Sequence, residues 1–476
     1  MGTKILGIDV GSVQICAVIG QHDETGLKII GIGTAKTQGI KKGVITNIEL
    51  ASKSIKSALI DAQRVAGTRY EKVVVSISGA YTKSVDSNGV VNVPTYEIGI
   101  KEIQRSMSES ERRAQIHSDY EKLHILPYNF KVDDQEHIED PLGMNGSRLE
   151  VQTHIIMAQK SSLSNLRKAL NLAGVEPDNI VLSSYASAIA TLNQDEKDLG
   201  VAFIDMGGAT CNMIIHSGNS IRYNEFLGIG SSNITNDLSA ALHTPILKAE
   251  DIKLNYGILL NNANELVEIP PINEDGKVQE VSLDVISNVI YARAEETLMI
   301  LAKMLEDSGY KNSIAAGVVL TGGMTKLEGI RELAIAVFDN MPVRIARPKE
   351  MEGLYEILRD PANSCAIGLC MYGAGYFTPY EIDSEKKMRY KDEIVVKNKI
   401  LKDIVYDNGV KIEDKKNIEE VDNKIFRGST LDDNYIDDLR IDDDRTLQDE
   451  LNEDESKKEK KPNVFSQIWN KLTQLF

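Results

Sequence analysis

The 476-residue chain has few of the residues that mark metal-binding, disulfide-rich or catalytic-histidine proteins. Its seven histidines form no ligand cluster, so the sequence predicts no catalytic histidine. Its four cysteines are scattered and lie mostly within apolar runs, and no pair has zinc-knuckle spacing; they are Cys16, Cys211, Cys365 and Cys370. We therefore expect reduced core thiols in a cytosolic protein.

The chain also has no apolar run near the ~20 residues that a membrane-spanning helix needs. Its first residues enter a predicted strand almost at once, without the shape of a signal peptide. The formal net charge of -17 and the pI near 5.0 argue against nucleic acid as a partner, because nucleic acid requires a basic face. The length is sufficient for two or more domains with their own cores.

One pattern occurs twice, as Ile8-Asp9-Val10-Gly11-Ser12 and as Ile204-Asp205-Met206-Gly207-Gly208. The apolar runs on both sides of each copy predict adjacent strands joined by a tight hairpin, with the Asp at the strand end. A single copy is more often an ordinary turn. Two facing copies would form a phosphate clamp, in which backbone N–H groups hold phosphate oxygens and both carboxylates hold hydrated Mg²⁺.

A third element, residues 318–324, is an apolar strand that ends in Gly322 and Gly323 and precedes a predicted helix from about Leu327. A strand, a glycine turn and a helix N-terminus together are typical of a nucleotide-binding site. In order and spacing, the three elements resemble the actin-like ATPase superfamily, which includes actin, the sugar kinases and the heat-shock chaperones. The resemblance implies two lobes with ATP and Mg²⁺ between them.

The segment between the two hairpins indicates which family of this superfamily the chain resembles. Residues 124–133 and 138–151, the latter containing Pro141-Leu142-Gly143-Met144, look like the inserted small domain of the FtsA family, the bacterial actin homologues of cell division. Leu149, Val151 and Thr153 alternate with polar residues, as in a half-buried strand. An unrelated α+β insertion is the alternative. The resemblance spans roughly residues 4 to 378.

The FtsA resemblance implies an α/β, two-lobed actin-like (ribonuclease-H-like duplicated) fold with an inserted α+β domain of the SHS2 type. The predicted parts are lobe 1 in segments 1–82, 161–198 and 351–382, the inserted domain at 83–160, lobe 2 at 199–350, a charged flexible linker at 383–462 and an amphipathic helix at 463–476.

The loops and the resemblance together give one set of predicted nucleotide-binding residues: Asp9, Gly11, Ser12, Asp205, Gly207, Gly208, Thr210, Glu250, Lys253, Gly322, Gly323 and Met324, with Asp9 and Asp205 also as metal ligands. In this superfamily the Glu and Lys hold the ribose and the base. Glu250 and Lys253 are three residues apart on one helix face, so a surface ion pair worth only ~0.3 kcal/mol is the alternative.

Several positions depart from the family pattern. A lysine that relatives commonly place at Gln14 or Cys16 is missing, and Ser231 replaces a usual glycine. Residues 181–185 contain no carboxylate to orient a water molecule for hydrolysis. We expect weakened nucleotide affinity and slow or no ATP turnover.

The last residues contain the only tryptophan and an apolar stripe at helical spacing: Val464, Phe465, Ile468, Trp469, Leu472, Leu475 and Phe476. Such a helix often packs on its own domain. Here it follows a long acidic tether. The composition of the tether predicts either a solvated, self-repelling linker or a docking segment for a partner. The tether favours a membrane-interface helix, as FtsA proteins have.

The resemblance implies a function as a peripheral protein on the cytoplasmic side of the cell membrane, at the division site. Its implied partners are FtsZ, copies of itself, anionic phospholipid and later divisome proteins. The FtsZ C-terminal peptide would dock near residues 235 to 315. The alternatives are a PilM-like adaptor of pilus assembly and a phosphotransferase of the sugar-kinase type.

Overall fold

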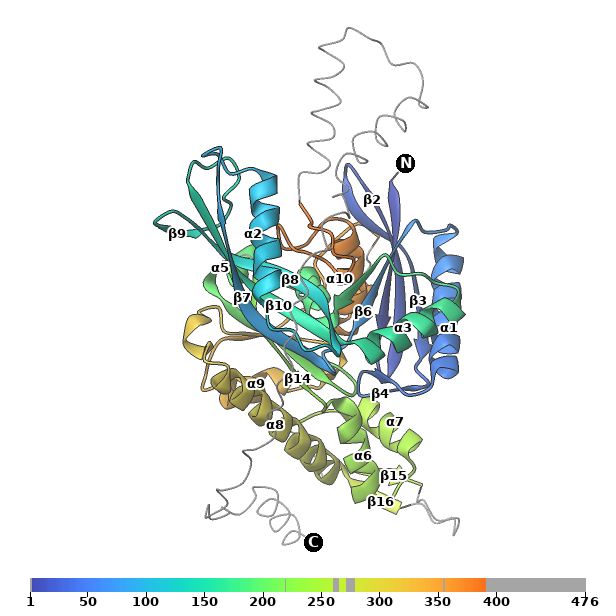
Figure 1. Cartoon of the computed structure of the whole chain (residues 1–476). Helices are drawn as coiled ribbons and strands as arrows, with labels where there is room; N and C mark the ends of the chain where they lie inside the picture. Colours follow the sequence, from blue (N-terminus) through green and yellow to red (C-terminus); the bar gives the residue numbers. More distant parts are fainter. Residues whose placement is uncertain (1, 219, 260–264, 271–278, 354–355, 391–476) are drawn as a thin grey trace, which may run out of the picture. The chain divides into compact units, whose positions relative to one another are not determined.

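The protein is described from a computed structural model that covers residues 2–390, except 219, 260–264, 271–278 and 354–355 (Figure 1). All of these residues belong to one unit of the chain, Met1–Lys397. The predicted tail helix and the predicted linker beyond residue 390 lie outside the described residues.

Lobe 1 is built on a five-stranded sheet in the order β11-β6-β1-β2-β3. Its strands are β1 (Thr3–Val10), β2 (Gln14–Asp23), β3 (Gly26–Lys36), β6 (Lys72–Ile77) and β11 (Asn179–Leu182), with a small hairpin of β4 (Ile40–Lys41) and β5 (Val44–Ile45). Its helices are α1 (Ile48–Ala66), α3 (Lys160–Ala173), α4 (Ser183–Thr191), α5 (Gln194–Leu199) and α10 (Ser364–Gly373).

Lobe 2 repeats the arrangement with the sheet order β14-β13-β12-β17-β18. Its strands are β12 (Val201–Met206), β13 (Cys211–Ser217), β14 (Ser220–Leu227), β17 (Val318–Thr321) and β18 (Val343–Ile345), plus the separate pair β15 (Leu266–Ile269) and β16 (Gln279–Ser282). The α-helices are α6 (Ser231–Ala241), α7 (Ile246–Tyr256), α8 (Leu283–Asp307) and α9 (Ile330–Val337), and the 3-10 turns are η1 (Lys311–Ser313), η2 (Gly323–Lys326), η3 (Glu356–Leu358) and η4 (Pro361–Asn363).

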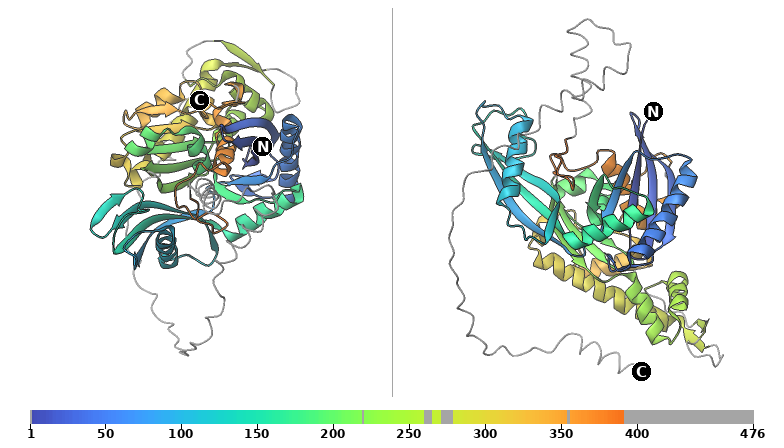
Figure 2. Two further views of the ribbon diagram at one scale, coloured as in Figure 1. Left: turned by 90° about the horizontal axis from the view of Figure 1, so that it is seen from above. Right: turned by 45° about the vertical axis from the view of Figure 1, so that its right-hand side comes forward.

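Helices α4 and α10 pack between the two sheets, whereas α1 and α3 cover the opposite face of the lobe 1 sheet (Figures 1 and 2). This explains the unbroken apolar runs, because a strand covered on both faces cannot alternate with polar residues. In β12, Val201 and Phe203 face one core, and Ala202 and Ile204 face the other. The two helices approach closely at Gly368, where a Cβ would lie 1.8 Å from the Ala186 carbonyl oxygen.

The inserted domain is an antiparallel sheet in the order β7-β10-β8-β9, with α2 (Ile100–Arg113) packed on one face (Figure 1). The strands are β7 (Thr82–Asn92), β8 (Tyr120–Val132), β9 (Gln135–Ile138) and β10 (Arg148–Gln159). The half-buried pattern predicted for β10 is confirmed at Leu149, Val151 and Thr153, which are buried. His154 breaks the pattern because it is buried against Asn224 of β14.

The folded chain continues past residue 382, where the sequence analysis places the start of the flexible linker. Asp383 and Ser384 are buried, and Arg389 forms an ion pair with Asp383. The charged composition of this segment predicts a solvated linker, but within the fold Asp383 pairs with Arg389, and Glu385 pairs with Arg167. The placement of residues 383–390 in the linker is therefore wrong. All four cysteines are free and buried, as predicted.

Candidate nucleotide site

Both predicted hairpins form, and each presents its aspartate at the end of its first strand. β1 pairs antiparallel with β2, and β12 with β13. A serine hydroxyl from a neighbouring element holds each carboxylate. Ser76 of β6 donates to Oδ1 of Asp9 at 2.8 Å, and Ser187 of α4 donates to Oδ2 of Asp205 at 2.6 Å.

The two carboxylates lie near enough to influence each other. Burial raises the pKa of Asp205 to about 6, and the negative charge of Asp9 contributes to that rise. Burial also raises the pKa of Asp9. Neither carboxylate is paired with a lysine or arginine among the described residues. The site therefore holds two acidic groups and lacks a balancing positive charge from the described part of the chain.

The turns of the two hairpins are in close contact with each other and with the third loop. A Cβ placed on Gly208 would lie 2.2 Å from Cγ2 of Val13, so only glycine allows this approach. Gly322, which follows β17, has a φ of 91° and lies against Asp205: a Cβ there would be 2.5 Å from Oδ1. The three predicted loops thus meet around the carboxylates of Asp9 and Asp205.

Backbone donors in these loops have no acceptor within the part of the chain that the structure describes. They are the N–H groups of Ser12, Val13, Gly208, Ala209, Gly323 and Met324. Successive unpaired N–H groups in a turn form an anion-binding concavity. The arrangement suits a polyphosphate.

The second hairpin is continuous with the predicted ribose and base residues. The N–H groups of Ser231 and Ser232, at the start of α6, donate to the carbonyls of Gly207 and Gly208 at 3.1 and 2.7 Å. Those two donors are therefore not free for a phosphate. Nζ of Lys253 in turn lies 3.3 Å from the Ser231 carbonyl oxygen.

Glu250 and Lys253 do form an ion pair, with 2.8 Å between Nζ and Oε2. It is not a simple surface pair, because the Lys253 side chain is only 8% exposed. Thr235 of α6 donates to Glu250 at 2.5 Å and accepts from Lys253 at 2.9 Å. The pair joins α7 to α6 beside the second hairpin, and about a third of the Glu250 side chain (37%) stays exposed for a ligand.

The remaining predicted nucleotide-binding residues contact other parts of the protein. The hydroxyl of Ser12 accepts from the Gly43 N–H at 2.7 Å, and the carbonyl of Thr210 accepts from Gly207 at 2.8 Å. The Met324 side chain is buried in the lobe 2 core, which leaves only its backbone for a ligand. The helix expected from about Leu327 begins at Ile330, after the 3-10 turn η2.

Sequence reasoning missed the groups that hold the carboxylates. Ser76 and Ser187 are buried, and Cys365 lies near enough to Asp9 to affect the pKa of its carboxyl group. The available signal was a single polar residue inside an apolar run, as in Val73–Ile77, since polar residues are rarely buried without a partner.

The donor set fits ATP with Mg²⁺. No group of three or more His, Cys, Asp or Glu side chains that could hold a metal ion occurs within the described ranges. Magnesium, however, commonly takes one or two carboxylates and completes its shell with water and phosphate oxygens. Asp9 and Asp205 meet that requirement, and the free N–H groups would supply the phosphate contacts.

Comparison with known proteins agrees with this architecture. A family model described as "Cell division protein FtsA" matches residues 202–368, and one described as "SHS2 domain inserted in FTSA" matches residues 79–157. The cell division protein FtsA of Helicobacter pylori strain J99 is 41% identical over 421 residues, covering 82% of this chain and 85% of that protein. The chain belongs to the FtsA family.

Other relatives place the FtsA resemblance in context. FtsA of Pseudomonas aeruginosa is 37% identical over 376 residues, which cover 78% of this chain and 89% of that protein. Among solved structures, the PilM–PilN type IV pilus biogenesis complex contains a chain that is 18% identical, with a TM-score of 0.57, covering 79% of this chain and 99% of that one. That likeness shows the shared fold alone. The actin-like fold with an SHS2 insertion is confirmed, and the family is FtsA rather than either alternative.

The predicted membrane residues Val464 to Phe476 lie outside the described residues. Among the helices that the structure does describe, none has the length and apolar character needed to cross a bilayer.

Proposed function

We propose that this protein is an actin-like cell division protein that binds ATP with Mg²⁺, assembles with copies of itself on the inner face of the cytoplasmic membrane and tethers FtsZ there. Later divisome proteins would be recruited to the assembly. The observation that carries the nucleotide part is the meeting of three glycine loops, with free N–H groups, around Asp9 and Asp205. FtsA family membership supports the division role.

In this proposal, Asp9 and Asp205 hold the magnesium ion, which balances phosphate charge, and the loop N–H groups hold the phosphates. Glu250 and Lys253 contact the nucleoside. The serine hydroxyls of Ser76 and Ser187 orient the carboxylates. No carboxylate is present in residues 181–185, so the site binds nucleotide without efficient hydrolysis.

Turnover is checked by phosphate release from saturating ATP. We expect turnover well below ~1 per second, the lower end of ordinary enzymes. A faster reaction would favour an enzyme over a nucleotide-dependent scaffold.

The membrane part rests on the sequence of the tail. Partial burial of its seven apolar residues contributes on the order of several kcal/mol at ~25 cal/mol per Å², which gives a reversible anchor. Several anchors in one assembly bind more tightly through avidity. Membrane attachment and self-assembly should therefore reinforce each other.

The test is co-sedimentation of the full chain with vesicles of phosphatidylglycerol and phosphatidylethanolamine, with and without FtsZ. Trp469→Glu, which places a charge in the apolar stripe, should abolish sedimentation of both proteins. Gln467→Glu adds the same charge off the stripe and should retain most binding. Equal sedimentation of the parent and Trp469→Glu would contradict the membrane anchor. Loss of FtsZ when its C-terminal peptide is removed would support docking through that peptide.

A further inference from the structure

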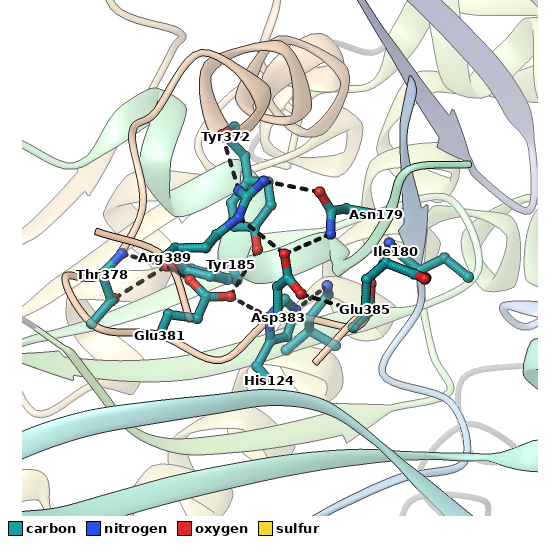
Figure 3. Close-up of polar contacts among 12 residues, drawn as sticks. His124, Asn179, Ile180, Tyr185, Tyr372, Thr378, Glu381, Asp383, Glu385 and Arg389 are labelled. Atoms are coloured by element: carbon teal, nitrogen blue, oxygen red, sulfur yellow. Dashed lines mark hydrogen bonds and ion pairs between the residues drawn. The ribbon is translucent and has the colours of Figure 1, made fainter. Parts of the chain in front are cut away.

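The last described segment, residues 378–390, lies between lobe 1 and the inserted domain, and we call it the strap (Figure 3). It follows α10 and belongs to neither the nucleotide site nor the inserted segment of the sequence. Its buried side chains and its backbone bond to both neighbours.

On the lobe 1 side, the strap provides hydrogen-bond partners for the edge strand of the sheet. β11 is the edge strand, and the N–H of Ile180 donates to the hydroxyl of Ser384 at 2.9 Å. The Asn179 amide donates to Asp383 at 2.9 Å and accepts from Arg389 at 2.9 Å. A buried carboxylate, an amide and a guanidinium thus form one closed network (Figure 3).

Toward the inserted domain, the strap extends the sheet. Ile382 exchanges both backbone hydrogen bonds with Ile125 of β8, each at 3.0 Å. The side chains of Tyr380 and Ile382 are buried in the inserted domain's core. The Tyr380 hydroxyl also donates to Asp140 at 2.6 Å.

Glu381 lies where the strap, β8, α4 and α10 meet, and its side chain is fully buried. It accepts hydrogen bonds from the hydroxyls of Tyr185 and Tyr372 at 2.9 and 2.8 Å. Nδ1 of His124 lies 2.6 Å from it. The Leu182 N–H donates to Nε2 of the same ring, so Nδ1 carries the proton and donates. Removal of the strap would leave these buried donors unpaired, which is costly.

Without the strap, the inserted domain would be held by its two covalent connections to lobe 1 and by side-chain contacts with β14, such as that of His154 with Asn224. Its two covalent connections to lobe 1 run side by side, since the N–H of Gln159 donates to the Tyr81 carbonyl at 3.2 Å. Two adjacent chain crossings form a natural hinge axis. The strap adds a third connection on β8, away from those crossings in the sequence.

We propose that the strap is a clamp that fixes the orientation of the inserted domain on lobe 1, and that assembly of subunits depends on this clamp. The assembly step rests on the proposed function, whereas the orientation step does not. Because the chain continues from the strap toward the charged segment and the tail, the same clamp would link the tail to the inserted domain.

The orientation step is tested on the full chain by distance measurements between spin labels at Lys56→Cys on α1 and Lys101→Cys on α2. Both positions are exposed, and the native cysteines are buried. Arg389→Ala removes the guanidinium from Asp383 and Asn179 and should broaden the distance distribution. Lys387→Ala, an exposed strap residue whose side chain makes no ion pair among the described residues, should leave it narrow. An unchanged distribution in Arg389→Ala would overturn the clamp.

The assembly step is tested on vesicles with ATP and Mg²⁺, by sedimentation and electron microscopy. Arg389→Ala should lose assemblies, whereas Lys387→Ala should keep them. Assembly by Arg389→Ala equal to the parent would overturn the dependence. If the parent itself does not assemble, the proposed self-association fails, and the spin-label result still decides the clamp.

Discussion

The two hairpins have turns of the same length but different surroundings. In the first, Thr37 donates to the Gly11 carbonyl at 2.8 Å and Gly43 donates to Ser12, so loops of its own lobe brace it. In the second, α6 donates to the carbonyls of Gly207 and Gly208, and Gly322 packs against Asp205. The first hairpin is fixed locally, whereas the second connects to the third loop and, through α6, to Lys253.

This difference predicts unequal effects of equivalent changes. A change in the second hairpin should disturb phosphate, metal and nucleoside contacts together, because its neighbours contribute to all three. A change in the first hairpin should disturb its own phosphate and metal contacts only. Variants at matched positions can therefore test the asymmetry.

The largest effect is expected for Gly208→Val. The added side chain would overlap Val13 and force the two hairpins apart, and overpacking of this kind typically costs about 1–3 kcal/mol. ATP affinity, measured by calorimetry, should fall at least about 100-fold, equivalent to roughly 2.7 kcal/mol. Gly218→Val, at a distant turn with a φ of 64° where the added side chain meets no neighbouring atom, tests whether strain elsewhere in lobe 2 is enough to lower ATP affinity. Equal losses in the two variants would contradict the specific contact.

The next largest effect is expected for Asp205→Asn compared with Asp9→Asn. Each removes a charge-assisted ligand worth ~1.5–3 kcal/mol, so Mg²⁺-dependent ATP binding should fall about 10- to 100-fold. Asp205→Asn should also stabilise the nucleotide-free protein at pH 7 by up to ~3 kcal/mol, because the raised pKa of about 6 means that folding disfavours the charged form. Thermal unfolding without nucleotide checks this. A lower midpoint for Asp205→Asn would contradict it.

A smaller effect is expected for Lys253→Met. The change breaks the ion pair with Glu250 and the contacts with α6, but it leaves both hairpins and their carboxylates in place. We expect about a tenfold loss of ATP affinity, near 1.4 kcal/mol, with no loss of affinity for inorganic triphosphate. Lys248→Met, on the same helix and in no ion pair among the described residues, is the control. A matching loss for triphosphate would show that Lys253 acts on the phosphate loops instead.

The smallest expected effect is on the pH dependence of stability, and it involves the second hairpin but not the first. Val201 pairs with His216 in the second hairpin, whereas the equivalent Ile5 pairs with Gly20 in the first. Burial holds the pKa of His216 well below its usual value. The unfolded chain then binds a proton near pH 6.5 that the folded chain does not, so stability is lost as pH falls below ~6.5.

The pH effect is measured by urea unfolding between pH 7 and 5. The parent should lose stability with a slope from this group of at most ~1.4 kcal/mol per pH unit, and His216→Leu should lose less. Equal slopes in the two proteins would show that His216 is not the group responsible.

The sheets and hairpins could be predicted from the sequence because each depends on neighbouring residues: apolar runs flank a short turn with Asp and Gly. The clamp network could not. Asp383 is buried because Asn179 hydrogen-bonds with it across 204 residues of sequence, and Arg389 completes the network. Local composition shows only a charged segment. Likewise, Ser76 and Ser187 acquire their roles from carboxylates on other strands.

The most direct test of the central claim, that three loops form one Mg²⁺–ATP site, is a calorimetric titration of the full chain with ATP, with and without Mg²⁺. We expect saturable ATP binding by the parent that weakens when Mg²⁺ is removed. In Asp205→Asn, ATP binding should be weaker and should no longer depend on Mg²⁺. Absence of binding at millimolar ATP, or binding by Asp205→Asn that keeps the full magnesium dependence of the parent, would contradict the claim.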